Sequence, residues 1–265
     1  MMKKIKMYQV DAFADRLFTG NPAAVCLLDS WIPAALMQSV AAENNLAETA
    51  FVVPKGDRFE IRWFTPTIEV DLCGHATLAS GFILLNGICA DRQEVIFDSL
   101  HSGELKVFKL ENAYFLDFPA DTLTASGEKS LLADCIGKLP LEVWKGKSDY
   151  MAVIGSEAML KDLRVDLAAI AKLPARGLIV TARGDTVDFV SRFFGPQSGV
   201  DEDPVTGSAH TTLIQYWSGV LGKDRMHARQ LSKRGGDLVC RKNGDRCMIG
   251  GMAQLYLEGE ISIEI

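Results

Sequence analysis

The sequence predicts an α+β protein of two pseudo-symmetric domains, each a curved β-sheet wrapped around a central helix. Three observations lead to this fold class. The chain nearly repeats itself, with Gly74 and Gly207 as equivalent positions 133 residues apart. Each half reads as several strands with two helices rather than as regularly alternating strands and helices. Each half also contains one helical segment that begins with glycine and is rich in apolar residues.

The repeat consists of spaced identities that keep their order along the chain. The offset is 130 just upstream of Gly74 and 133 from there onward. The paired positions are Phe59 and Phe189, Arg62 and Arg192, Phe64 and Phe194, Pro66 and Pro196, Asp91 and Asp224, Ser99 and Ser232, Gly103 and Gly236, and Leu105 and Leu238. A period this long indicates two domains rather than a solenoid. We therefore expect domains at 1–122 and 123–265, with a C-terminal strand able to pack back on the first domain.

The first half begins with a strand and then a helix. Ser30 is the expected N-cap of that helix, with Pro33 in its first turn, and the helix should end by Asn44-Asn45. The segments expected to form strands are 6–13, 49–53, 59–64, 95–110 with a break at Ser102-Gly103, and 114–118.

The central helix of the first half is expected over 74–85, where nearly every residue is apolar. A helix that is apolar all round is buried on every side. Its counterpart, over 207–217, also begins with glycine but carries more polar residues. The linker between the halves is expected within 119–129. The strands expected in the second half are 178–181, 189–194, 238–242 and 254–265.

Composition excludes several classes of protein. The net charge of −6 and the pI near 5.3 argue against a nucleic-acid binder. No apolar run approaches the ~20 residues that cross a membrane, and no secretory segment follows Met1. Six cysteines without a Cys-x-x-Cys pair indicate reduced thiols in a cytoplasmic protein. The four histidines form no His-Glu-x-x-His motif, so no metal site is expected.

Three segments combine polar groups with apolar structure. Glu48 leads an apolar strand, where partial burial would favour the protonated form that a general acid/base needs. Cys73 precedes the first glycine-led helix, whose N-terminus would stabilise a thiolate. Asp203 precedes the second such helix. The structural alternatives are a solvent-facing Glu48, a Cys73 that packs as a small hydrophobe, a core histidine at His75, and simple helix capping around Asp203.

These segments together resemble the PhzF-like phenazine-biosynthesis family. The matching stretches are Phe18-Thr-Gly-Asn-Pro-Ala-Ala-Val25, Asn45-Leu-Ala-Glu-Thr-Ala-Phe51, Phe64-Thr-Pro66, Cys73-Gly-His-Ala-Thr77 and Glu202-Asp-Pro-Val-Thr-Gly-Ser-Ala-His210. They occur in the family's order from about Met7 to the C-terminus. The resemblance implies a diaminopimelate-epimerase-like fold, with the active site in the cleft between two domains. It also implies a homodimer, which no apolar stripe in the sequence indicates independently.

The resemblance assigns roles to residues of this chain. Glu48 matches the family's catalytic carboxylate, and the polar residues around the substrate are matched by His75, Asp203 and Ser208. The remaining pocket positions are Asn21, Cys73, Gly74, Thr206 and Gly207. Related epimerases use one cysteine from each half, but here Thr206 stands opposite Cys73. A two-thiol mechanism therefore lacks its second base.

The resulting expectation is a cofactor-free isomerase that moves a proton on a small carboxylate substrate, with Glu48 as general acid/base. Two alternatives stay open. One is an epimerase or racemase in which Cys73 works with an opposed carboxylate, either Glu48 or Asp203. The other is a non-catalytic protein that binds a small acid.

Overall fold

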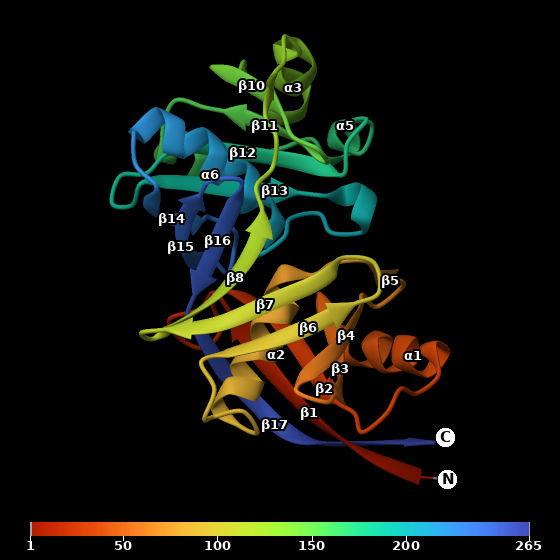
Figure 1. Ribbon diagram of the computed structural model, residues 1–265. Coiled ribbons are helices and arrows are strands. Elements are labelled where there is room, and N and C mark those ends of the chain that lie inside the picture. The colour runs from red at the N-terminus through yellow and green to blue at the C-terminus, as the bar shows by residue number, and fades with distance from the viewer. Residues whose placement is uncertain (1, 265) are drawn as a thin grey trace. The chain divides into compact units, whose positions relative to one another are not determined.

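The computed structural model describes residues 2–264, which form two compact units, each with its own core (Figure 1). The first unit, called unit 1 here, comprises 2–117 and 250–264. The second, unit 2, comprises 118–249. The last strand of the chain thus belongs with the first, and unit 2 is one continuous stretch of sequence between the two parts of unit 1.

Unit 1 is a curved, mostly antiparallel sheet (Figure 1). Its strands are β1 (Met2–Ala12), β2 (Asn21–Leu27), β3 (Glu48–Lys55), β4 (Arg58–Phe64), β5 (Glu69–Val70), β6 (Glu94–Ser99), β7 (Gly103–Leu110), β8 (Ala113–Pro119) and β17 (Ala253–Glu264). Its helices are α1 (Ala34–Asn44) and α2 (Gly74–Asn86). Strand β1 pairs with β17 on one side and with β2 on the other, both antiparallel. Beyond β2, the parallel pairs β2–β3 and β4–β6 alternate with the antiparallel pairs β3–β4 and β6–β7.

Unit 2 contains the remaining elements. Its strands are β9 (Thr124–Ala125), β10 (Glu142–Lys145), β11 (Asp149–Val153), β12 (Gly177–Arg183), β13 (Phe189–Phe194), β14 (Arg225–Gln230), β15 (Gly236–Asn243) and β16 (Arg246–Gly251), which leads back to unit 1. Its helices are α3 (Lys129–Ile136), α4 (Glu157–Lys161), α5 (Leu167–Ile170), the short 3₁₀ helix η1 (Pro196–Ser198) and α6 (Gly207–Leu221).

Unit 2 repeats the pairing order of unit 1. Strand β9 pairs with β10 antiparallel, as β17 does with β1, and β10 pairs with β11 antiparallel, as β1 does with β2. The pairs β11–β12 and β13–β14 are parallel, while β12–β13 and β14–β15 are antiparallel. This is the order found from β2 to β7. The sequence repeat is therefore a repeat of whole supersecondary units.

The central helices begin where the sequence predicts, at Gly74 and at Gly207. Helix α2 packs against β1, β2, β3, β6 and β7, and every residue from His75 to Leu85 except Phe82 is buried. Gly81 permits this close fit, because a Cβ atom there would lie 2.4 Å from Val107 Cγ1 on β7. Helix α6 packs against β15, and its Trp217 stacks on Phe189 of β13 at 5.7 Å.

One predicted helix start is wrong, and several elements were not predicted. Helix α1 begins at Ala34 after Pro33, whose ψ of 137° lies outside the helical region, so Ser30 is not its cap. A proline disfavours the helical conformation of the residue before it, which explains why the helix does not extend back to Ser30. The end at Asn45, in the left-handed conformation, agrees with prediction. The elements from α3 to α5 lie in the stretch 129–170, for which no element was predicted.

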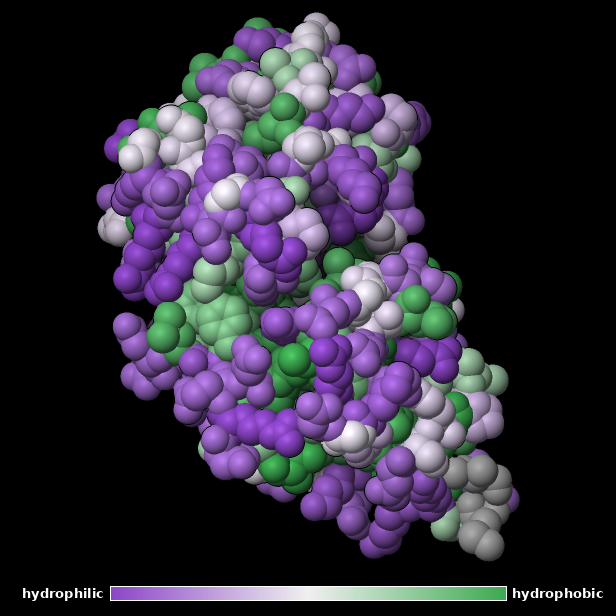
Figure 2. All heavy atoms as spheres, viewed as in Figure 1, coloured by the Kyte–Doolittle hydropathy of each residue, from purple (hydrophilic) through white to green (hydrophobic). Residues whose placement is uncertain are grey.

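Hydrophilic side chains cover most of the face shown in Figure 2, with apolar side chains scattered among them. All six cysteines are buried and free. Within residues 2–264, no helix is both long enough and apolar enough to cross a membrane.

Candidate functional site

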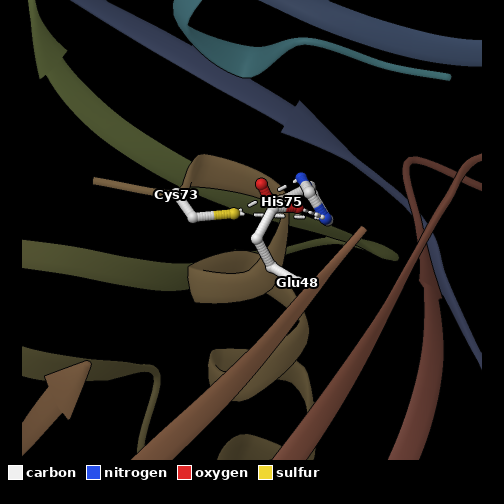
Figure 3. A group of neighbouring side chains, drawn as sticks. All are labelled: Glu48, Cys73 and His75. Carbon is white, nitrogen blue, oxygen red and sulfur yellow. Dashed lines mark hydrogen bonds and ion pairs between the residues drawn. The ribbon is translucent and has the colours of Figure 1, made fainter. Parts of the chain in front are cut away.

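Three predicted site residues meet at the start of helix α2 in unit 1 (Figure 3). Glu48 is the first residue of β3, Cys73 is the N-cap of α2, and His75 is the second residue of that helix. His75 Nε2 lies 3.1 Å from Glu48 Oε2, and Cys73 Sγ lies 3.5 Å from His75 Nδ1. The side chain of His75 is 6% exposed and that of Glu48 is 17% exposed. The carboxylate is therefore largely desolvated but still reaches the surface.

Asn21, the first residue of β2, fixes the orientation of the imidazole. Its side-chain Nδ2 lies 3.2 Å from His75 Nδ1, and Asn21 is fully buried. With its amide nitrogen toward the ring, Asn21 donates to an unprotonated Nδ1, and the proton of a neutral His75 then sits on Nε2. That proton faces the Glu48 carboxylate.

Burial and the Glu48 charge both shift the pKa values of Cys73 and His75: they act together on Cys73 and against each other on His75. Burial raises the pKa of Cys73 to about 11, and the Glu48 charge adds to this against the opposing effect of His75. Burial alone would lower the pKa of His75. The Cys73 sulfur and the Glu48 carboxylate beside the ring outweigh burial and raise the pKa of His75 well above its ordinary value. Of the two interpretations left open for Cys73, the raised pKa favours the buried thiol over the thiolate, because desolvation outweighs the helix N-terminus.

The Glu48 carboxylate keeps one buried oxygen without a hydrogen bond. Oε2 is within ion-pair distance of His75, but among residues 2–264 it has no hydrogen-bond partner of acceptable geometry. Such an orphaned buried acceptor is costly, and native structures retain few of them. A carboxylate oxygen of this kind can accept a proton from a bound ligand, or can coordinate a cation.

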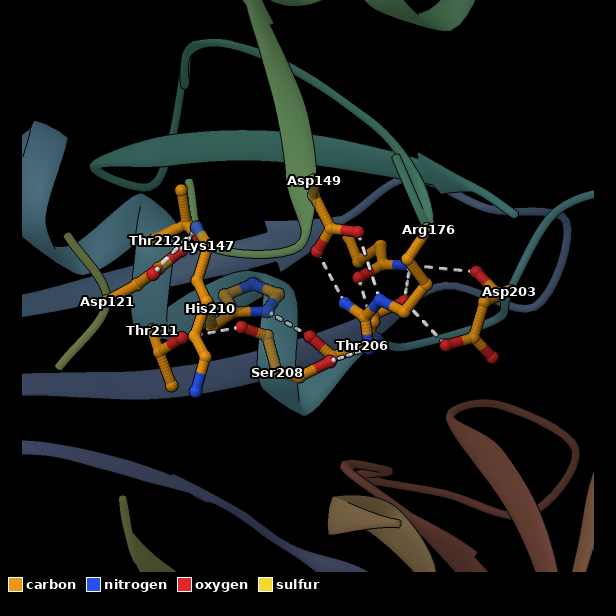
Figure 4. A network of polar contacts seen from close by, with 11 residues as sticks. Asp121, Lys147, Asp149, Arg176, Asp203, Thr206, Ser208, His210, Thr211 and Thr212 are labelled. Carbon is orange, nitrogen blue, oxygen red and sulfur yellow. Dashed lines mark hydrogen bonds and ion pairs between the residues drawn. The ribbon is translucent and has the colours of Figure 1, made fainter. Parts of the chain in front are cut away.

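A second polar cluster lies at the start of helix α6 in unit 2 (Figure 4). Thr206 is the N-cap, and its hydroxyl donates a 2.5 Å hydrogen bond to Asp203 Oδ2. The buried side chain of Gln230 accepts from the Thr206 backbone N–H at 2.9 Å and donates to the Asp203 carbonyl at 2.8 Å. Gln230 therefore fixes the loop that presents Asp203 and the start of the helix.

Two residues of this cluster were not predicted. Asp149, the first residue of β11, is buried and accepts two hydrogen bonds from the Arg176 guanidinium, at 3.0 Å from Nε and 2.5 Å from Nη2. The remaining nitrogen, Nη1, donates to Ser208 Oγ at 2.9 Å. Burial would lower the pKa of Arg176, but the hydrogen bonds and charge of Asp149, with Asp203 and Asp121 adding, raise it. The guanidinium is a fixed positive charge beside Ser208.

The two clusters occupy equivalent positions of the repeat but place groups of opposite charge beside the second residue of the central helix. His75 and Ser208 are each the second residue of a central helix. Glu48 begins β3 and contacts His75, whereas Arg176 directly precedes β12 and contacts Ser208. One repeat thus places a carboxylate beside its helix start, and the other places a guanidinium there. A charged residue just before an apolar strand is the sequence signal that would have identified Arg176.

The structure places every predicted site residue in one of these clusters. Unit 1 brings together Asn21, Glu48, Cys73, Gly74 and His75. Unit 2 brings together Asp203, Thr206, Gly207 and Ser208. Nearby His210 is a core residue: it is fully buried, hydrogen-bonded to the Thr206 carbonyl, and burial lowers its pKa to about 4.

A metal ion would find ligands in only one described group, although no metal site was predicted. Within residues 2–264, the ligand atoms of Glu48, Cys73 and His75 lie within 4.8 Å of one another. This donor set of one carboxylate, one thiol and one imidazole matches the preference of zinc-like cations.

The chain is similar to a known family over nearly its whole length. The profile of the family described as "Phenazine biosynthesis-like protein" matches residues 10–259. An "uncharacterized isomerase" of Pseudomonas aeruginosa is 47% identical over 260 residues, covering 98% of this chain and 99% of that protein. A crystal structure of a PhzF-family phenazine biosynthesis protein of Enterococcus faecalis superposes with a TM-score of 0.94. It is 44% identical, and the match covers 98% of this chain and 99% of that one.

More distant structures share the fold alone. A hydroxyproline epimerase of Agrobacterium vitis superposes with a TM-score of 0.60 at 10% identity, covering 98% of this chain and 92% of that one. The predicted fold class, two repeated α+β domains of diaminopimelate-epimerase-like architecture, is confirmed.

Proposed function

The chain belongs to the phenazine biosynthesis-like family, and on that premise we propose that it is an isomerase that moves a proton on a small carboxylate substrate without a cofactor. One observation carries the proposal: the Glu48 carboxylate is largely buried, and its Oε2 has no hydrogen bond of acceptable geometry within residues 2–264. A base in this state is ready to accept a proton from an acidic carbon.

His75 complements this role. Its Nε2 lies 3.1 Å from Glu48 Oε2, so a protonated His75 places a positive charge beside the carboxylate when the base is ionised. The positive end of the α2 dipole would stabilise the negative charge that develops on the substrate. The proton that Glu48 removes returns to a different carbon, so the reaction is a net isomerisation.

The cluster of unit 2 has the chemistry to bind the carboxylate of the substrate. Arg176 offers a guanidinium, Ser208 a hydroxyl, and the start of α6 free N–H groups. Because Asp149 holds Arg176 in a two-bond arrangement, the guanidinium is oriented before a ligand arrives. Asp203 is proposed to orient the polar part of the substrate, together with Ser208.

The geometry of unit 1 argues against an epimerase that uses Cys73 and Glu48 as its two bases. Two bases on opposite faces of one carbon each stand about 3–3.5 Å from it, so they lie roughly 6 Å apart. The ligand atoms of Cys73 and Glu48 lie within 4.8 Å of each other. A neutral Cys73 thiol is also a poor base. Substitution of Cys73 by Ala should leave turnover nearly unchanged under the proposed function and should abolish it in any thiol-dependent epimerase.

Deuterium uptake tests the proposal directly. A metabolite extract in D₂O is incubated with wild-type protein, with Glu48→Gln and with Glu43→Gln, the same substitution at an exposed position of α1. We expect one metabolite to gain one mass unit with wild type and with Glu43→Gln but not with Glu48→Gln. Uptake that persists in Glu48→Gln would exclude Glu48 as the base. Ligand binding without uptake by any variant would favour the small-acid binding protein.

A further inference from the structure

The Glu48–Cys73–His75 cluster has the donor atoms of a metal site, which proton transfer does not require. It combines three donor types that soft and borderline cations prefer, and all three are held on rigid elements. Glu48 begins a strand in the core of unit 1, and Cys73 and His75 are two residues apart across a helix start. The buried Glu48 Oε2 without a hydrogen bond is an acceptor that a cation would satisfy.

Asn21 supplies the second contact that metal-binding histidines generally have. A ligating imidazole usually holds its other ring nitrogen in a hydrogen bond, which fixes the ring orientation. Here Asn21 lies 3.2 Å from Nδ1, and Nε2 is the nitrogen that faces Glu48; Cys73 Sγ lies beside the ring, 3.5 Å from Nδ1 and 4.0 Å from Nε2. Reversal of the Asn21 amide would let its oxygen accept from a protonated Nδ1 and would free the Nε2 lone pair for a metal.

The distances are close to those of a tetrahedral centre. Ligand atoms bound about 2.0–2.3 Å from a zinc ion lie about 3.3–3.6 Å from one another. His75 Nε2 is 3.1 Å from Glu48 Oε2 and 4.0 Å from Cys73 Sγ. The ligand atoms of Cys73 and Glu48 lie within 4.8 Å of each other, so side-chain shifts of up to about 1 Å would bring all three atoms onto one ion. Three protein ligands leave the fourth position of the metal open to water.

The geometry points to a binding site for one zinc-class divalent cation, ligated by Glu48 Oε2, Cys73 Sγ and His75 Nε2. Binding forms metal–sulfur, metal–nitrogen and metal–oxygen bonds. The Cys73 thiol proton and the Nε2 proton of a protonated His75 are released to solvent, while the Nδ1 proton stays hydrogen-bonded to the reversed Asn21 amide. The site exists independently of the proposed function. If Glu48 is also the base, which rests on the proposed function, the bound cation occupies the lone pair that would take the substrate proton and acts as a reversible inhibitor.

Cobalt is the sharpest probe, because Co²⁺ enters zinc sites and a cobalt–thiolate bond gives a near-ultraviolet charge-transfer absorption. Untagged protein, freed of metal with a chelator, is titrated with Co²⁺ and then with Zn²⁺, which should displace it. We expect one ion per chain and the thiolate absorption. The absorption should vanish in Cys73→Ala and in Cys73→Ser, and the affinity should fall at least ~tenfold in Glu48→Gln.

Two matched controls separate this site from unspecific binding. Cys89→Ala removes another buried thiol of unit 1, and His101→Ala removes an exposed histidine that lies 3.8 Å from Asp71. Both should bind like wild type. Melting curves with and without Zn²⁺ show that each variant is folded, and only variants with the site intact should melt higher with metal.

The outcomes also separate the metal site from the proposed function. Absence of the thiolate absorption in wild type, or its persistence in Cys73→Ala, would overturn the site even if deuterium uptake depends on Glu48. Zn²⁺ binding that requires all three ligands would establish the site. Uptake that then continues with the site saturated by Zn²⁺ would count against Glu48 as the base and leave the metal site intact.

Discussion

Replacement of Arg176 by Met isolates the role of the positive charge in unit 2. In wild type this guanidinium donates two hydrogen bonds to Asp149 and one to Ser208. Methionine retains much of the side-chain volume but leaves the Asp149 carboxylate, which is 4% exposed, without its counter-ion. Removal of one partner from a fully buried pair costs about 3–5 kcal/mol.

The expected loss is smaller, because the Arg176 side chain is 38% exposed and water partly screens the pair. We expect the free energy of unfolding to fall by about 2 kcal/mol at neutral pH. For a unit of this size, the melting temperature should fall by roughly 6–10 °C.

The loss should depend on pH, with a sign set by Asp149. Burial raises the pKa of Asp149 above 3.8, and the hydrogen bonds and charge of Arg176 oppose that rise. Without Arg176 the pKa of folded Asp149 rises further. When the pKa of an acid is higher in the folded protein than in the unfolded chain, protonation of that acid stabilises the fold. This contribution is complete below the unfolded-state pKa and is lost as pH rises through the folded-state pKa. The penalty of Arg176→Met should therefore be largest at neutral pH and should shrink as the solution is acidified.

Urea unfolding from neutral to mildly acidic pH measures this difference. Arg183→Met, the same substitution at the exposed end of β12, is the control and should change stability little. A penalty for Arg176→Met that does not vary with pH, or that equals the control's, would refute the claim that the buried Asp149 charge is its source.

Three further predictions concern the core and the thiol. Gly81→Ala should lower the free energy of unfolding by about 1–3 kcal/mol, because its Cβ would overlap Val107. Chemical denaturation measures this loss, and unchanged stability would contradict the close fit. Thr181→Val should cost about 2 kcal/mol in the same assay, because the buried indole N–H of Trp217 loses its 3.0 Å acceptor; Thr181→Ser, which keeps the hydroxyl, should lose less. Cys73 should alkylate slowly at neutral pH and about tenfold faster per pH unit up to its pKa of about 11, as measured by peptide mass; a rate independent of pH would contradict a neutral thiol.

The sequence predicted the elements whose signal is local or repeated. The helix at Gly74 was found because it is apolar all round, and the repeat offset located the second helix at Gly207. The stretch 129–170 was missed because helices of four to eight residues and strands of four or five are too short to show a period. Local propensity also placed a cap at Ser30, which the backbone of Pro33 overrides.

The candidate site was predictable where a motif was contiguous. Cys73 and His75 are neighbours in sequence, and the resemblance connected them with Glu48. Arg176 was missed because its partners, Asp149 and Ser208, are 27 and 32 residues away, and only the folded chain brings them together. The sequence left the protonation state of Cys73 open for a related reason: its burial depends on the packing of the whole helix.

The pairing of the first strand with the last has a consequence for synthesis on the ribosome. Strand β1 pairs with β17 from Met2 opposite Glu264 to Ala12 opposite Ala253, so one edge of β1 has its partner at the far end of the chain. At about 5–20 residues per second, that edge waits roughly 10–50 s for its partner. Residues 118–249 all emerge earlier and can complete their own core. The nascent chain therefore carries an open strand edge, a template for wrong pairing, until translation is almost finished.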